Sequence, residues 1–187
     1  MLIDELPERA EVMEKILQEL GHRIVARVSV SSDLTSMVYR YHPDIIIIDL
    51  ESPDRDTLEH MQSISTNQPR PIVMFTNDDD SDTIQRAIKA GVSAYIVDGL
   101  QPKRVMPILD TAIARFDEFQ SIRKELQKTR DTLTERKLIE RAKGILMKKS
   151  GYDEEAAYKA MRKLAMDRNI KLVELARSII AASELLK

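Results

Sequence analysis

The run Asp44-Ile45-Ile46-Ile47-Ile48-Asp49 is the feature that most constrains the fold. A continuous β-branched run bounded by acids is typical of a strand buried on both faces, as in a parallel sheet covered by helices. Residues 1–3, 23–30, 71–76 and 94–97 predict four more strands, the first of them short. Helical patterns alternate with these strands. The first half is therefore predicted to be α/β, a doubly wound five-stranded parallel sheet built from right-handed βαβ units.

The predicted helices between the strands span residues 7–20, 33–41, 55–65 and 81–90, and a further helix starts near residue 101. Ser32 or Asp33 is expected to cap the second helix, and Gly21 and Gly91 follow the ends of the first and fourth.

From about residue 112 the strand patterns stop. An apolar stripe with 3-4-3-4 spacing follows, formed by Phe119, Ile122, Leu126, Thr129 and Leu133. This stripe could pack on the chain's own first half, but its narrow width favours pairing with a second copy. Residues 154–167, with Asp153 as N-cap, and residues 172–180 then predict two amphipathic helices, which complete a three-helix unit.

The balance of charge changes along the 187-residue chain at about the same place as the predicted secondary structure does. Residues 1–110 contain 11 Lys/Arg and 19 Asp/Glu, whereas residues 111–187 contain 18 and 12. Such asymmetry indicates two parts with different partners. No cysteine is present, so a disulfide framework and a thiolate zinc site are excluded. Without a signal-peptide pattern or a long apolar run, the chain is expected to be cytoplasmic, with no membrane partner.

Polar side chains fall where the predicted strands end. These are Asp4 and Glu5 after the first strand, Asp49 after the third and Thr76 after the fourth. Open parallel sheets bind ligands at this edge. Carboxylates gathered there could hold Mg²⁺ through Asp4, Glu5 and Asp49, with Asp49 as a candidate phosphoryl acceptor. No other cofactor is required by the pattern.

These residues resemble the receiver domain of two-component response regulators, a CheY-type fold, over residues 1–110. The resemblance rests on the run from Pro43 to Asp49, on Pro53 and on Thr76. In receivers the last strand is followed by a lysine and a proline, but here Asp98 and Gly99 stand at those positions. An aspartate in place of the lysine should repel a phosphoryl group. We therefore expect a pseudo-receiver rather than a working phosphoacceptor.

The C-terminal unit resembles the ANTAR domain of antitermination regulators of the AmiR/NasR group. The matching residues are Ala142-Lys143-Gly144-Ile145-Leu146-Met147, Glu155-Ala156-Ala157-Tyr158, Met161-Arg162, Ala165-Met166, Asn169, Leu172 and Glu174-Leu175-Ala176. The expected organisation is a receiver-like domain at 1–110, a helical, coiled-coil-like linker at 111–135 and an ANTAR domain at 128–187. With Asp98-Gly99, the whole chain is most similar to the nitrate-responsive, NasT-like members.

This resemblance implies that the protein is an RNA-binding antiterminator. It would bind paired stem-loops in a leader transcript and prevent a terminator from forming. A homodimer, at least when RNA is bound, is expected through the apolar stripe. A nitrate- or nitrite-sensing protein or a sensor kinase would be the controlling partner.

Residues 136–171 concentrate basic charge, with 11 Lys/Arg against 5 Asp/Glu, and phosphate contacts supply much of the affinity for nucleic acid. The candidate RNA contacts are Lys143, Gly144, Lys148, Lys149, Tyr158, Arg162 and Arg168. Structural alternatives remain for several of these positions. Gly144, with Ala142 and Ala157, could permit close helix packing, Tyr158 could be a core aromatic, and Lys148 and Lys149 could serve a helix C-terminus.

Two other functions fit less well. Three helices with basic residues could form a DNA-binding, phosphorylation-controlled response regulator, although the pattern shows no recognition helix. The unit could also serve only protein interactions. We do not expect an enzyme, because His22, His42 and His60 accompany no nucleophile motif or paired acid.

Overall fold

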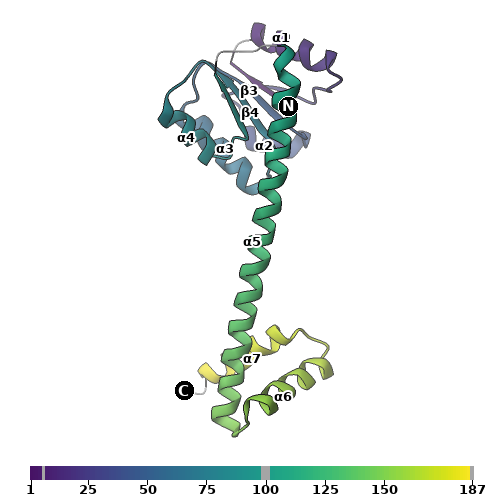
Figure 1. The fold of residues 1–187 in the computed structure, drawn as a ribbon, viewed down its shortest axis with the longest axis vertical. Helices are drawn as coiled ribbons and strands as arrows, with labels where there is room; N and C mark the ends of the chain where they lie inside the picture. The colour runs from purple at the N-terminus through teal and green to yellow at the C-terminus, as the bar shows by residue number, and fades with distance from the viewer. Residues whose placement is uncertain (6, 98–101, 186–187) are drawn as a thin grey trace. The chain divides into compact units, whose positions relative to one another are not determined.

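The computed structural model describes residues 1–5, 7–97 and 102–185. They divide into two compact units, Met1–Gln120 and Ser121–Lys187 (Figure 1). The elements are β1 (Leu2–Asp4), α1 (Pro7–Glu19), β2 (Arg27–Ser29), α2 (Leu34–Tyr41), β3 (Ile46–Asp49), α3 (Arg55–Asn67), β4 (Ile72–Thr76), α4 (Ser81–Lys89), β5 (Ala94–Val97), α5 (Pro102–Ser150), α6 (Glu154–Asp167) and α7 (Leu172–Leu185).

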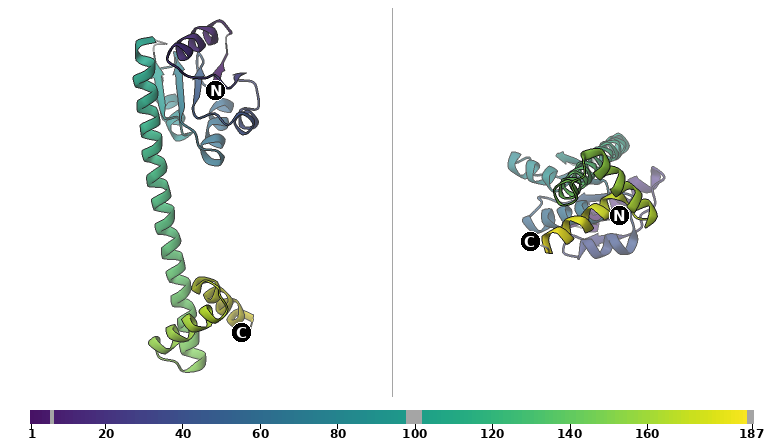
Figure 2. Two further views of the ribbon diagram at one scale, coloured as in Figure 1. Left: turned by 90° about the vertical axis from the view of Figure 1, so that its right-hand side faces the viewer. Right: turned by 90° about the horizontal axis from the view of Figure 1, so that it is seen from below.

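The first unit is a five-stranded parallel sheet in the order β2-β1-β3-β4-β5. Alternate residues of β3 enter two separate cores, as the two-residue period of a strand requires. Ile46 and Ile48 pack in a cluster with residues of α2, α3 and α4. Ile47 packs in a second cluster with residues of α1 and of the first turns of α5. Figure 2 shows the ribbon of this unit, with helices packed against the sheet. The predicted doubly wound α/β fold is confirmed.

The second strand is shorter than predicted. The sequence indicated residues 23–30, but only Arg27, Val28 and Ser29 pair, each with one residue of β1. β2 lies at the edge of the sheet, and β1 has only three residues to offer it. The length of β1 therefore limits how many residues of β2 can pair. The flanking valines and isoleucine favour strand structure but have no partner in β1.

Caps and turns follow the sequence closely. Asp33 caps α2 by accepting a hydrogen bond from the Ser36 amide at 3.1 Å, and Asp153 caps α6 in the same way at Ala156, at 2.7 Å. Gly91, beyond α4, has a φ of +97°. A Cβ there would lie 2.2 Å from the Ser65 Oγ, so this turn needs glycine for both conformation and space.

The second unit has a small core of its own. Ala142 of α5, Met161 and Ala165 of α6, and Ala176 and Ile180 of α7 lie in it, with Leu175. Further toward the start of α5, the predicted apolar stripe is exposed: Phe119 by 60%, Ile122 by 55%, Leu126 by 49% and Leu133 by 52%. None of the described helices combines the length and the apolar character needed to cross a membrane.

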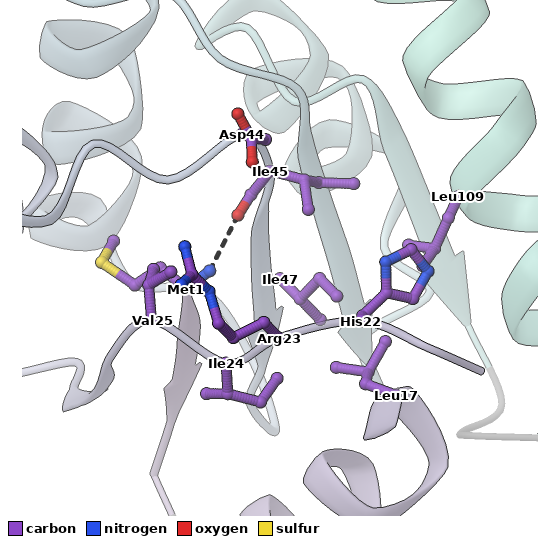
Figure 3. A pocket seen from close by; sticks show the side chains of 10 residues that line it. All are labelled: Met1, Leu17, His22, Arg23, Ile24, Val25, Asp44, Ile45, Ile47 and Leu109. Carbon is purple, nitrogen blue, oxygen red and sulfur yellow. Dashed lines mark hydrogen bonds between the residues drawn. The ribbon is translucent and has the colours of Figure 1, made fainter. Parts of the chain in front are cut away.

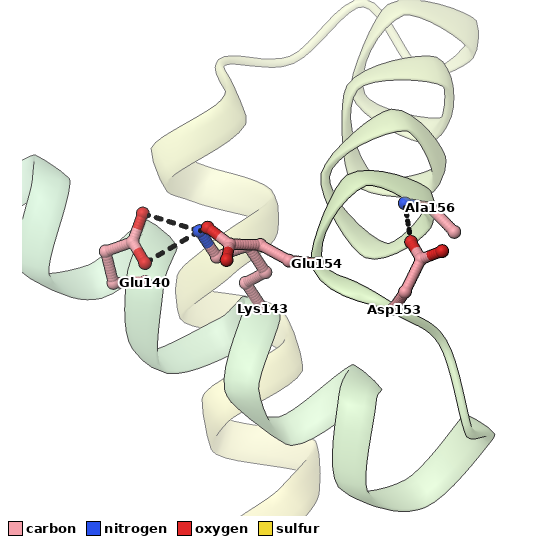
Figure 4. A network of polar contacts seen from close by, with 5 residues as sticks. All are labelled: Glu140, Lys143, Asp153, Glu154 and Ala156. Atoms are coloured by element: carbon pink, nitrogen blue, oxygen red, sulfur yellow. Dashed lines mark hydrogen bonds and ion pairs between the residues drawn. The ribbon is translucent and has the colours of Figure 1, made fainter.

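An ion cluster joins α5 to α6 at Lys143, whose carboxylate partners Glu140 and Glu154 are 64% and 73% exposed (Figure 4). The Lys143 ammonium lies 2.7 Å from a Glu140 carboxylate oxygen and 2.8 Å from one of Glu154, and its side chain is only 9% exposed. The hydrogen bonds that the Lys143 ammonium donates to Glu140 and then to Glu154 raise the pKa of Lys143, and Lys143 in turn lowers the pKa of Glu154. The contribution of Glu154 to stability is therefore complete above the ordinary glutamate pKa and is lost as pH falls through the lowered value.

We predict that Lys143→Met lowers the melting temperature of the chain by several degrees, measured by circular dichroism. The substitution removes the cation that Glu140 and Glu154 share, so two ion pairs are lost and the two carboxylates repel each other. The triple variant K143M/E140Q/E154Q should recover most of the loss, because it leaves no charge unpaired.

Lys159→Met is the matched control. It breaks the Lys159–Glu155 pair, whose side chains are 74% and 78% exposed, and pairs of that kind contribute little. Equal losses in Lys143→Met and Lys159→Met would contradict the structural role of the Lys143 ion cluster.

Candidate functional site

The carboxyl edge of the sheet brings together three predicted site residues. Asp4 ends β1 and Asp49 ends β3, and the two are direct partners in the parallel pairing. Thr76 ends β4, one residue beyond Phe75, which is the partner of Asp49. All three are buried, with exposures of 7%, 3% and 0%. The parallel topology thus places two carboxylates and a hydroxyl at one edge, as the sequence predicted.

The loop after β3 organises this edge. The Glu51 amide donates to the Glu5 carboxylate at 3.3 Å, and the Thr76 hydroxyl donates to the Glu51 carbonyl at 2.7 Å. The same hydroxyl accepts a hydrogen bond from the Asp78 amide at 3.1 Å. Thr76 therefore links two loops. Asp98 and Gly99 lie outside the described residues.

Glu51 and Asp78 were missed by the sequence reasoning. Asp78 accepts from the Ser52 hydroxyl through its carboxylate and from the Tyr95 hydroxyl, at 2.9 Å, through its carbonyl. Burial raises the pKa of Tyr95, which keeps its hydroxyl a donor at neutral pH. The only sequence signal was the acidic run that contains Asp78, and an acidic run does not predict contacts made by a backbone carbonyl.

The predicted three-carboxylate Mg²⁺ site is not formed in this structure. Among the described residues, no three carboxylate or imidazole side chains lie close enough together to hold a metal ion. Asp4 and Asp49 are neighbours, but Glu5 is directed to the Glu51 amide.

A cavity of about 140 Å³ lies at the opposite edge of the sheet, at the amino ends of β1 and β3 (Figure 3). Its lining residues are Met1, Leu17, His22, Arg23, Ile24, Val25, Asp44, Ile45, Ile47 and Leu109. His22 lies in this wall, with its Nε2 3.3 Å from the Met106 sulfur. No serine, threonine or cysteine is among the ten described lining residues.

In the second unit, Lys143 requires a correction. It was predicted to contact RNA, but its ammonium is enclosed by Glu140 and Glu154 and its charge is neutralised within the protein. Charge density along the sequence could not reveal this, because Glu154 approaches only when α6 folds back on α5. Lys143 is therefore removed from the set of proposed RNA contacts.

The structure does not support one of the two roles predicted for Gly144, which is to permit close helix packing. A Cβ added to Gly144 would meet no heavy atom within 4 Å, beyond its own helix backbone and chain neighbours, so close helix packing does not require this glycine. In contrast, Ala142 and Ala157 are fully buried, as the packing interpretation expects. A glycine inside a helix costs about 1 kcal/mol relative to alanine. The fold of this unit offers no compensation for that cost.

The other candidates lie on the surface. Lys148 and Lys149 are exposed in the last turn of α5, where the helix dipole also favours cations. Tyr158 is 43% exposed on α6, and Arg162, one turn further, is exposed on the same side. Arg168 is the exposed C-cap of α6. These side chains present cations and an aromatic ring to solvent.

Comparison with known proteins gives a consistent result. The model of the response regulator receiver domain matches residues 1–110, and the ANTAR domain model matches residues 127–180. The transcriptional regulatory protein PdtaR of Mycobacterium tuberculosis is 31% identical over 177 residues, which cover 95% of this chain and 86% of that protein. The nitrate regulatory protein of Klebsiella oxytoca is 46% identical over 68 residues, or 36% of this chain and 17% of that protein.

Solved structures show the same fold for the first unit. A CheY-like response regulator receiver domain protein from Methanospirillum hungatei JF-1 superposes with a TM-score of 0.54 at 16% identity, covering 63% of this chain and 94% of that one. The sheet topology, the edge formed by Asp4, Asp49 and Thr76, and the two domain matches lead to one conclusion. The chain belongs to the response regulators that carry a receiver domain followed by an ANTAR domain.

Proposed function

We propose that this regulator is an RNA-binding transcription antiterminator, which binds paired stem-loops in a leader transcript and so prevents a terminator from forming. The observation that carries the proposal is the exposed basic surface of the ANTAR domain. Lys148 and Lys149 at the end of α5, and Arg162 and Arg168 on α6, are all exposed. Lysine and arginine side chains on such a surface can neutralise RNA phosphates.

Tyr158 adds a feature suited to RNA rather than to duplex DNA. Unpaired bases in RNA loops stack on aromatic side chains and on guanidinium planes. The exposed Tyr158 ring lies one helical turn from Arg162, so one face of α6 offers both kinds of surface. A loop base is thus a suitable ligand for this face.

For the receiver domain, we propose control by a protein partner rather than by phosphorylation of Asp49. Asp98 replaces the lysine that would bind a phosphoryl group, and the Thr76 hydroxyl is already engaged by the loops around Glu51 and Asp78. A nitrate- or nitrite-sensing protein or a sensor kinase is the proposed partner. The similarity to the nitrate regulatory protein supports a role in nitrate or nitrite assimilation.

We further propose that two copies pair through the exposed stripe on α5. Phe119, Ile122, Leu126 and Leu133 continue the heptad spacing over 14 residues, about 21 Å of helix. A seam of two heptads is short, so the dimer should be weak alone. Two linked stem-loops would raise the effective concentration of the second copy and strengthen it.

The first prediction concerns RNA affinity. K148A/K149A should weaken binding to a two-hairpin leader RNA at least about tenfold at moderate salt, because two phosphate contacts are lost. Gel shifts of the full chain measure this, with the matching duplex DNA in parallel. K124A/K128A, which removes two exposed lysines nearer the start of α5, is the control. Tighter binding to the DNA would instead support the DNA-binding alternative.

The second prediction concerns Asp49. Incubation with a small-molecule phosphodonor and Mg²⁺ should give no stoichiometric mass gain by intact mass spectrometry. Asp98→Lys should increase the labelling, because it restores a cation at that position. Asp49→Asn in the Asp98→Lys background identifies the acceptor. Stoichiometric labelling of the unmodified chain at Asp49 would overturn control without phosphorylation.

The third prediction concerns the oligomeric state. With RNA bound, light scattering should show two copies of the chain per two-hairpin RNA. Leu126→Glu should give one copy, because a buried carboxylate at the seam is unfavourable. Lys124→Glu changes charge on another side of α5 and should leave the dimer intact. A single copy on the two-hairpin RNA with the unmodified chain would contradict pairing through the stripe.

A further inference from the structure

Gly144 is a costly residue that the folded chain does not use. Unlike Gly21, Gly91 and Gly151, it does not have a positive φ. It lies inside α5, and a Cβ there would meet no atom within 4 Å. Neither backbone conformation nor packing within the described residues therefore requires glycine, although glycine weakens a helix. The remaining explanation is that a ligand outside the folded chain requires glycine at this position.

The surroundings of Gly144 indicate what that requirement is. Lys137, Arg141, Gly144 and Lys148 are spaced i, i+4, i+7 and i+11, which places them along one face of α5. We call this set the α5 basic stripe. It is about 16 Å long. All three cations are exposed, whereas Lys143 is rotated away by about 100° and buried against Glu154.

We propose that the α5 basic stripe binds the RNA sugar–phosphate backbone, and that the RNA backbone approaches the helix most closely at Gly144. This inference rests on the proposed RNA-binding function and adds Lys137 and Arg141 to the contacts. Lysine and arginine on either side of Gly144 would bind successive phosphates. The missing side chain lets the RNA backbone approach the helix itself, which is a use of glycine found where a ligand comes close.

A carboxylate of the same unit competes for the α5 basic stripe. Arg141 Nη2 lies 2.7 Å from Glu184 Oε1 of α7, with the two side chains 59% and 55% exposed. An exposed pair of this kind contributes little to stability. A phosphate can therefore replace Glu184 as the partner of Arg141, and removal of the Glu184 charge should favour RNA.

The test uses the full chain and an RNA hairpin selected against it from a pool with randomised loops. Gly144→Ala should weaken RNA binding about tenfold or more while raising the melting temperature, because the added methyl group obstructs the backbone but stabilises the helix. Thr132→Ala, an exposed helix-favouring change on another face of α5, should leave the affinity unchanged.

Arg141→Gln and Glu184→Gln provide a test with opposite signs. Arg141→Gln, Lys137→Gln and Lys148→Gln should each weaken binding several-fold and reduce the slope of log affinity against log salt by about 0.7 to 0.9. Glu184→Gln should strengthen binding. If Arg141 only held α7 in place, Arg141→Gln and Glu184→Gln would weaken binding together. Lys15→Gln, in the receiver domain, is the charge control.

The possible results separate the two proposals. If selection recovers no RNA that the chain binds, the proposed function fails. If RNA binds but Gly144→Ala binds equally well, or if Arg141→Gln and Glu184→Gln change affinity in the same direction, the α5 basic stripe is wrong and the proposed function stands. If duplex DNA competes equally and shows the same dependence on Gly144, RNA is not the specific occupant.

Discussion

Burial of the sheet on both faces is the constraint on which the receiver domain depends. Ile46, Ile47, Ile48 and Asp49 of β3 are each no more than 3% exposed, so helices must cover both sides, as is usual for the parallel pairing that these strands adopt. Side chains that need polar partners are then tolerated where strands end and loops supply hydrogen bonds. Asp49 and Thr76 lie at such ends. The position of the candidate site is thus a consequence of the topology.

Much of the secondary structure could be predicted from the sequence, because it depends on local residue patterns. Period-two and period-3.6 spacing located the strands and helices, and the caps Asp33 and Asp153 act within their own helices. The length of β2 could not be predicted, since it depends on the three residues that β1 offers. The links from Thr76 to Glu51 and Asp78 join separate loops, and sequence spacing carries no information on such contacts.

In the ANTAR domain, too, local sequence patterns predicted the helices but not the contacts between them. Lys143 and Gly144 are neighbours in a basic segment, and the sequence made both of them candidate RNA contacts, with close helix packing as an alternative for Gly144. A helix rotates by about 100° per residue, so the two point in different directions. Lys143 meets Glu154 only because α6 folds back toward α5. Counting cations therefore overestimated the number that are exposed to a nucleic acid, and the ion pairs of the folded unit decide which ones remain accessible.

The two faces described here suit different parts of RNA recognition. Cations along α5 would supply salt-dependent affinity without regard to sequence, because every nucleotide carries the same phosphate. Discrimination between RNAs has to come from groups that contact bases, and Tyr158 with Arg162 on α6 is the face with that chemistry. The Lys143 ion cluster links α5 to α6, the two helices that carry these faces. On the proposed function, a residue placed between the two faces would then influence whether one stem-loop can reach both surfaces at once.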